Sequence, residues 1–257
     1  MNFFHAIVLG IVEGITEFLP ISSTGHLILA SKILHLSSTD FLKSFEITIQ
    51  LGAILAVVVL YWRSFFVRFE ILKKVIVAFL PTAVLGLIFY KIIKQFLLGN
   101  EQVVLWALFL GGVFLIVFEL FYREKNNAVD DVANISWGQA VLIGLFQSIA
   151  VIPGVSRAAA TIVGGLILGL KRKTIVEFSF LLAVPTMAAA TGLDLIKSAG
   201  DFSFSQFGFL AIGFIFSFLT ALGAIRFLLR FIKNHSFILF GFYRIILAVL
   251  FWFLLKI

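Results

Sequence analysis

Six long stretches of the chain are almost entirely apolar, and this feature limits the possible folds most strongly. A helix of about 20 residues crosses the ~30 Å hydrocarbon core of a bilayer, where every backbone polar group must be hydrogen-bonded within the protein. The sequence therefore predicts an all-α integral membrane protein. The six predicted transmembrane helices cover approximately residues 45–62, 75–94, 102–121, 177–196, 205–229 and 237–255.

The composition agrees with a membrane protein. Charged residues make up 13% of the 257 positions and hydrophobic residues 61%, whereas soluble domains contain about 25% charged residues. The net charge of +7 does not indicate a nucleic-acid partner, because no basic stripe with interleaved aromatic residues is present. The absence of cysteine excludes disulfides and thiolate metal sites. The first basic residue is Lys32, so we expect no cleaved signal peptide.

Two further apolar regions are interrupted. Residues 3–34 are broken at Leu19-Pro20 and by the hydroxyl residues that follow, and residues 137–170 are broken at Pro153-Gly154. The resulting half-segments are short for the bilayer core. Irregular backbone at membrane depth is tolerated only where protein or a wet cavity satisfies its polar groups. These regions therefore predict two re-entrant helical hairpins whose breaks face an interior site.

The two halves of the chain resemble each other. The resemblance predicts one membrane domain, residues 1–257, built from repeat 1 (about 1–122), a polar linker (about 123–136) and repeat 2 (about 137–257). Each half holds one hairpin and three spans, an odd number of crossings, so the repeats should have inverted topology. At a shift of 133 or 134 residues, Gly10–Glu13 falls on Gly144–Gln147, Pro20 on Pro153, Ser23 on Ser156 and Phe45 on Phe178.

The distribution of cations predicts the orientation. One set of loops carries twelve of the 20 Lys and Arg residues, while Arg157 and Arg244 lie inside apolar or broken regions. Cytoplasmic loops carry the excess of cations, so both termini should lie outside and the two hairpins should enter from opposite sides. The other side carries only Lys32, Lys43, Lys91, Lys94, Lys197 and Lys256.

The first break combines acids, hydroxyls and an imidazole. Glu13 and Glu17 are four residues apart on an apolar helix and should share a face. Ionisable groups at membrane depth usually mark function, and two carboxylates suit acid–base catalysis or a cation site, although an interfacial pair facing water is the alternative. Ser22, Ser23 and Thr24 either cap the next helix or help to bind an anion at its N-terminus. His26 could act as a base for Ser23.

The second break places Ser156 and Arg157 at the start of another helix. A cation in the first turn of a helix is locally unfavourable. It becomes favourable if a polyanion binds there, because guanidinium groups and helix-terminal amides both bind phosphate oxygens. An ion pair with Glu13 or Glu17 is the alternative. Together the two breaks suit phosphoryl transfer, in which positioning and charge stabilisation carry most of the catalysis.

The stretch from Glu13 to His26 and the stretch from Pro153 to Arg157 closely resemble the two signature motifs of bacterial undecaprenyl-diphosphate phosphatases, the bacitracin-resistance family. The likeness extends to residues 164–170 and 177–185. It implies an enzyme of the bacterial inner membrane that hydrolyses undecaprenyl diphosphate to undecaprenyl phosphate for cell-wall synthesis. Its active site would open to the outer, periplasmic face.

The resemblance also implies roles for individual residues. Ser23 matches the proposed nucleophile and Arg157 the phosphate-binding arginine, while His26 is an alternative nucleophile and shares with Glu17 the role of proton acceptor. Ser22, Thr24 and Ser156 would contact phosphate, and Glu13 with Glu17 would either assist catalysis or hold Mg²⁺ or Ca²⁺. No organic cofactor is implied.

One departure and one alternative remain. Ala158 and Ala159 stand where the family usually has Ser and Gly, which removes a hydroxyl and some turn flexibility. Inverted repeats with broken helices are also typical of transporters, so a flippase for the lipid carrier is the alternative function. Polyprenyl diphosphate and bilayer lipids are the expected partners, and the sequence leaves the oligomeric state open, a homodimer included.

Overall fold

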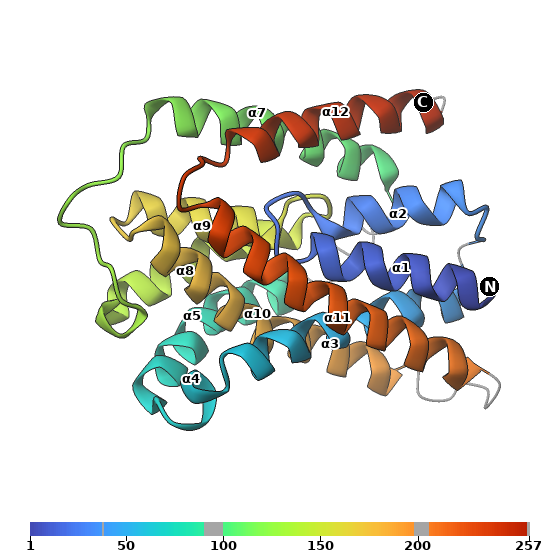
Figure 1. Ribbon diagram of the computed structural model, residues 1–257, viewed down its shortest axis with the longest axis horizontal. Coiled ribbons are helices and arrows are strands. Elements are labelled where there is room, and N and C mark those ends of the chain that lie inside the picture. The colour runs from blue at the N-terminus through green and yellow to red at the C-terminus, as the bar shows by residue number, and fades with distance from the viewer. Residues whose placement is uncertain (38, 90–99, 198–205, 256–257) are drawn as a thin grey trace.

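A computed structural model describes residues 1–37, 39–89, 100–197 and 206–255 (Figure 1). Within these residues the chain is helical, with no strand beyond one isolated bridge between Val129 and Leu170. The all-α prediction is confirmed. The ends of two predicted spans, 90–94 and residue 205, lie outside the described residues, as do the cations Lys91, Lys94 and Lys256.

The helices follow the predicted order along the chain. They are α1 (Phe3–Thr16), α2 (Ser23–Ile33), α3 (Asp40–Leu60), α4 (Trp62–Phe66), α5 (Phe69–Ile88), α7 (Glu101–Phe121), α8 (Trp137–Ser148), α9 (Arg157–Ile167), α10 (Arg172–Lys197), α11 (Phe207–Phe231) and α12 (Ile238–Leu255). Two short 3-10 turns, η2 (Val132–Asn134) and η3 (Ile149–Val151), precede and follow α8.

Five helices of the described chain are long and apolar enough to cross a membrane, namely α3, α5, α7, α10 and α11. The sixth predicted span coincides with α12, which is apolar but shorter than those five. Helix α3 begins five residues before the predicted start, because the Thr39 side chain accepts a hydrogen bond from the Leu42 backbone N–H and caps the helix at that point.

The two broken regions form helical hairpins. Helix α1 packs against α2, and α8 packs against α9. In Figure 1 the first hairpin starts at the end of the molecule that holds both termini, the second starts at the opposite end, and both turns lie near the middle. Each turn contains a residue with positive φ, Ser22 at 70° and Gly154 at 91°. These turns interrupt the helices at the predicted places.

The helix contacts repeat between the two halves. Helix α1 packs against α11, and its counterpart α8 packs against α5, the counterpart of α11. Helices α3 and α10 pack against each other, as do α7 and α12. An internal two-fold relation between the halves would produce this set of pairs, and the inverted repeat itself stays a prediction.

Glycines make the tightest of these contacts. A Cβ atom on Gly10 would collide with the carbonyl oxygen of Gly213 on α11, and one on Gly144 would collide with the carbonyl oxygen of Ala78 on α5. Gly10 and Gly144 occupy equivalent positions in the two halves. Small residues at membrane helix interfaces allow the backbones to approach closely. Each hairpin thus packs closely against a long helix from the other half of the chain, α1 against α11 and α8 against α5.

We predict that Gly144→Ala lowers the stability of the folded protein, because the added methyl group forces α8 away from α5, and overpacking costs about 1–3 kcal/mol. The matched control is Gly138→Ala on the same helix, where a Cβ atom meets nothing within 4 Å. Thermal unfolding in detergent measures both variants. Equal melting temperatures would contradict this interpretation of the contact.

Candidate active site

The two helix breaks meet at one polar cavity of about 140 Å³. Both breaks contribute lining residues, and α3 and α10 contribute one residue each, Gln50 and Met187. The lining residues are Glu17, Ser22, Ser23, Thr24, Gln50, Ala150, Val155, Ser156, Arg157 and Met187. Six of the eight predicted site residues therefore line one cavity, and Glu13 and His26 do not.

Ser23 and Glu17 form the closest contact in this cavity. The Ser23 hydroxyl donates a hydrogen bond to Glu17 Oε2 at 2.5 Å, and both side chains are buried. Helix α1 ends at Thr16, so Glu17 lies in the turn itself, and Ser23 is the first residue of α2. The turn brings the carboxylate back over the start of the next helix. A hydroxyl that donates to a carboxylate has its proton acceptor in place.

Arg157 links the second break to the first. Its guanidinium contacts the other oxygen of Glu17 at 3.3 Å and donates to the Ser179 carbonyl at 2.9 Å. The ion pair that was the alternative to phosphate binding is therefore present, and it lies inside the cavity. The Arg157 Nε group has no hydrogen-bond partner, so the guanidinium keeps donor capacity for a further acceptor.

The hydroxyl residues around this pair differ in their roles. Ser156 caps α9 by accepting a hydrogen bond from the Ala159 backbone N–H at 3.1 Å. Ser22 makes no capping hydrogen bond with its side chain, and Thr24 is exposed. The N-termini of α2 and α9 both border the cavity, and free amides at helix N-termini bind anions.

His26 is hydrogen-bonded to groups other than the Ser23 hydroxyl. Its Nδ1 atom lies 2.7 Å from the Ser22 carbonyl oxygen and its Nε2 atom 2.7 Å from the Tyr243 hydroxyl. The Tyr243 ring stacks on the imidazole at a centroid distance of 5.5 Å. Both ring nitrogens therefore have partners, and Glu17 is the residue that contacts the Ser23 hydroxyl.

Glu13 is fully buried beside the cavity, and both carboxylate oxygens have no hydrogen-bond partner. Its counterpart in the second half, Gln147, donates to the hydroxyls of Thr82 and Thr186. The amide nitrogen of Gln147 thus has protein partners, whereas its Oε1 atom, like both Glu13 oxygens, has none. Among the described residues, no three or more His, Asp or Glu side chains gather to hold a metal ion. One or two carboxylates are enough to bind Mg²⁺, because waters and substrate oxygens supply its remaining ligands.

Sequence reasoning missed Gln50 and Tyr243. Gln50 is an uncharged polar residue inside the apolar α3, and that isolated amide was a usable signal. Tyr243 gave no such signal, because tyrosine is common at the membrane–water interfaces of transmembrane proteins. The departure at Ala158 and Ala159 lies outside the cavity, with Ala158 buried in the core.

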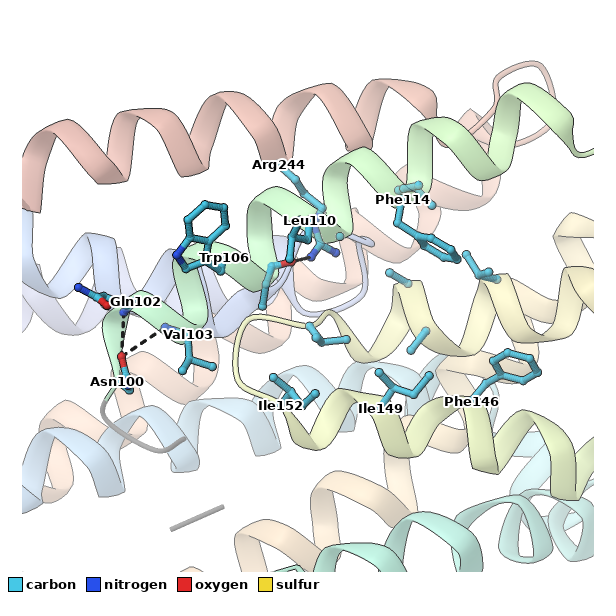
Figure 2. Close-up of a pocket in the computed structure, with 17 residues that line it drawn as sticks. Asn100, Gln102, Val103, Trp106, Leu110, Phe114, Phe146, Ile149, Ile152 and Arg244 are labelled. Atoms are coloured by element: carbon cyan, nitrogen blue, oxygen red, sulfur yellow. Dashed lines mark hydrogen bonds between the residues drawn. The ribbon is translucent and has the colours of Figure 1, made fainter. Parts of the chain in front are cut away.

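A larger apolar groove of about 650 Å³ adjoins the cavity, and Val155 lines both. Figure 2 shows the groove between α7 and the second hairpin, with Trp106, Leu110 and Phe114 facing Phe146, Ile149 and Ile152. Its few polar residues are Asn100 and Gln102 at one end and Arg244. A small polar cavity and a larger apolar groove thus share Val155 as a lining residue.

The fold defines a multi-pass membrane protein in which two helix breaks line one polar cavity. Residues 6–250 match the family model described as "Bacitracin resistance protein BacA". The chain belongs to this family. It is 56% identical to a protein named undecaprenyl-diphosphatase from Aquifex aeolicus, over 98% of each chain.

Other relatives with the same name cover the chain equally well. The protein from Sulfurihydrogenibium sp. is 51% identical over 98% of this chain and 99% of its own length. The protein from Wolinella succinogenes is 49% identical over 99% of both. The resemblance of the two motifs to this family is therefore confirmed over nearly the whole chain.

Proposed function

We propose that this protein hydrolyses undecaprenyl diphosphate to undecaprenyl phosphate and inorganic phosphate, and so recycles the lipid carrier of cell-wall synthesis and confers bacitracin resistance. The contact between Ser23 and Glu17, with Arg157 on the same carboxylate, carries the proposal. The family and the names of the relatives agree with it.

In the proposed reaction Ser23 Oγ attacks the terminal phosphorus and its proton passes to Glu17 Oε2. The bond between that phosphorus and the bridging oxygen breaks, and undecaprenyl phosphate leaves with the bridging oxygen and with the proton from Glu17, so that the carboxylate is ionised again. Water then attacks the phosphoserine, Glu17 accepts a proton from this water, and inorganic phosphate departs as Ser23 regains its proton. Arg157 stabilises the charge on the transferring phosphoryl oxygens, and the N-termini of α2 and α9 supply N–H donors.

We further propose that Glu13 and Glu17 hold a divalent cation, Mg²⁺ or Ca²⁺. The two unpartnered oxygens of the buried Glu13 fit this role, because an isolated buried carboxylate is costly. A bound cation would neutralise phosphate charge.

The catalytic proposal predicts graded losses of activity. In detergent, Ser23→Ala should lower kcat for phosphate release on the order of a thousandfold or more, because the nucleophile is lost. Arg157→Ala and Glu17→Ala should each lower it by about 100-fold or more, because charge stabilisation or proton transfer is lost. Full activity of Ser23→Ala would exclude Ser23 as the nucleophile. Absence of phosphate release by the wild type, together with lipid transport in vesicles, would support the flippase alternative.

The apolar groove is the proposed site of the polyprenyl chain. It meets the polar cavity at Val155, so a lipid with its diphosphate in the cavity can extend its tail along α7. Ala160 lines this groove and is only partly buried. The side chain at that position therefore limits the width available to the tail.

We predict that Ala160→Phe raises KM for undecaprenyl diphosphate by about tenfold and leaves KM for farnesyl diphosphate nearly unchanged, because only the long chain has to pass position 160. The control is Ala189→Phe on α10, where the side chain is exposed and outside both cavities. An equal effect of Ala160→Phe on both substrates would contradict the proposed tail site.

We propose that the protein lies in the bacterial inner membrane as six spans and two re-entrant hairpins in inverted repeats. The site would open to the periplasmic face. The repeated helix pairs and the opposed hairpins support this topology. The loop after α3, the linker 123–136 and the loop after α11 would lie in the cytoplasm.

Cysteine labelling tests this orientation, since the chain contains no cysteine. The side chains of Glu70 and Asp130, on the predicted cytoplasmic side, are each 66% exposed. The side chain of Asp40, the first residue of α3 on the predicted outer side, is 84% exposed. We expect an impermeant maleimide to label Asp40→Cys in intact spheroplasts, and Glu70→Cys and Asp130→Cys only after permeabilisation. The reverse pattern would invert the topology.

A further inference from the structure

Arg244 is a buried cation that the proposed reaction does not use. It lies on α12 and is 1% exposed. Within the part of the chain that the structure describes, no carboxylate pairs with it. Figure 2 shows its side chain reaching from α12 toward α7 and the second hairpin. A buried charge without a partner is costly, so this arginine must obtain its compensation from other groups.

Four backbone carbonyls provide that compensation. Two belong to α7: Ala107 accepts from Nη2 at 2.8 Å and Leu108 from Nε at 3.3 Å. The other two belong to the helix breaks: Pro20 accepts from Nη1 at 3.4 Å and Gly154 from Nη2 at 3.2 Å. One guanidinium therefore contacts both breaks at once.

The surrounding structure leaves room for this group. A Cβ atom on Gly111 of α7 would collide with the guanidinium, so a side chain there would displace it. Gly154 adopts a φ of 91°, which favours glycine and orients its carbonyl within the turn. The planar fork of arginine can donate to several carbonyls at once, whereas lysine has a single ammonium.

We propose that Arg244 is a positioning residue that holds the two breaks at the separation needed for phosphoryl transfer. This inference rests on the proposed function. Pro20 lies midway between Glu17 and Ser23 in the chain, and Gly154 lies three residues before Arg157. Arg244 lines the apolar groove but not the polar cavity, so its effect on phosphoryl transfer acts through these breaks.

The need for such a link follows from the other contacts between the breaks. In the described residues, the hydrogen bonds that join them directly are Arg157 to Glu17 at 3.3 Å and Ser156 Oγ to the Leu19 carbonyl at 3.5 Å. A bound phosphate competes with Glu17 for the Arg157 guanidinium. The bonds of Arg244 are independent of that competition and keep the breaks together while Arg157 engages the substrate.

A double-mutant cycle tests the proposal. The rate of phosphate release is measured for the wild type, Arg244→Met, Arg157→Ala and the double variant. Each rate is normalised to the amount of folded protein. We expect Arg244→Met to lower kcat more than it raises KM. In the Arg244→Met background, the loss of kcat caused by Arg157→Ala should be smaller than in the wild type on the order of tenfold, because Arg157 is already misplaced there. Independent, multiplicative effects would overturn the proposal.

Arg172→Met is the matched control. Arg172 is a mostly buried arginine that pairs with Glu119 at the opposite end of the molecule from the termini. Arg172→Met should lower the melting temperature, and the changes in kcat caused by Arg172→Met and Arg157→Ala should be independent, so that their factors multiply.

If Arg244→Met does not fold, the same cycle is run with Arg244→Lys, which keeps the charge but lacks the planar guanidinium. The same coupling with Arg157→Ala is expected. An inactive wild type would refute the proposed function; an active wild type without coupling would refute only the role of Arg244.

Discussion

Broken helices inside a membrane must have their free backbone groups satisfied by the protein, and this requirement determines the rest of the structure. The two turns satisfy it jointly. Arg244 donates to a carbonyl in each turn, and Ser156 caps α9 while its hydroxyl also approaches the Leu19 carbonyl. In the proposed re-entrant topology, neither hairpin alone would satisfy the free backbone groups of its own turn. The same pairing places Ser23 and Arg157 around one cavity.

This arrangement explains how a charged headgroup can be processed by a protein made mainly of apolar helices. The polar cavity is small and confined to the breaks, so few charged groups have to be buried. The apolar groove begins at its edge, at Val155, and can take the part of the lipid that needs no polar partner. In the proposed function, the polar cavity therefore binds the diphosphate headgroup and the apolar groove binds the polyprenyl tail.

The elements that depend on local sequence were predictable. Apolar length indicated the spans, and Pro20 and Pro153-Gly154 indicated the breaks, so Glu17, Ser23 and Arg157 could be assigned to one site. Other features depend on tertiary contacts. The orientation of His26 is set by Tyr243, 217 positions away. Arg244 was visible as a buried charge, but its carbonyl partners come from three separate segments, which no local pattern reveals.

An experimental structure with a non-hydrolysable methylene diphosphonate analogue of the polyprenyl substrate would test the central claim most directly. The account predicts that the terminal phosphorus lies against Ser23 Oγ, with Arg157 bound to its oxygens and the tail along α7. A diphosphonate bound instead at the opposite end of the molecule, for example beside Arg172, with an empty cavity between the breaks, would contradict it.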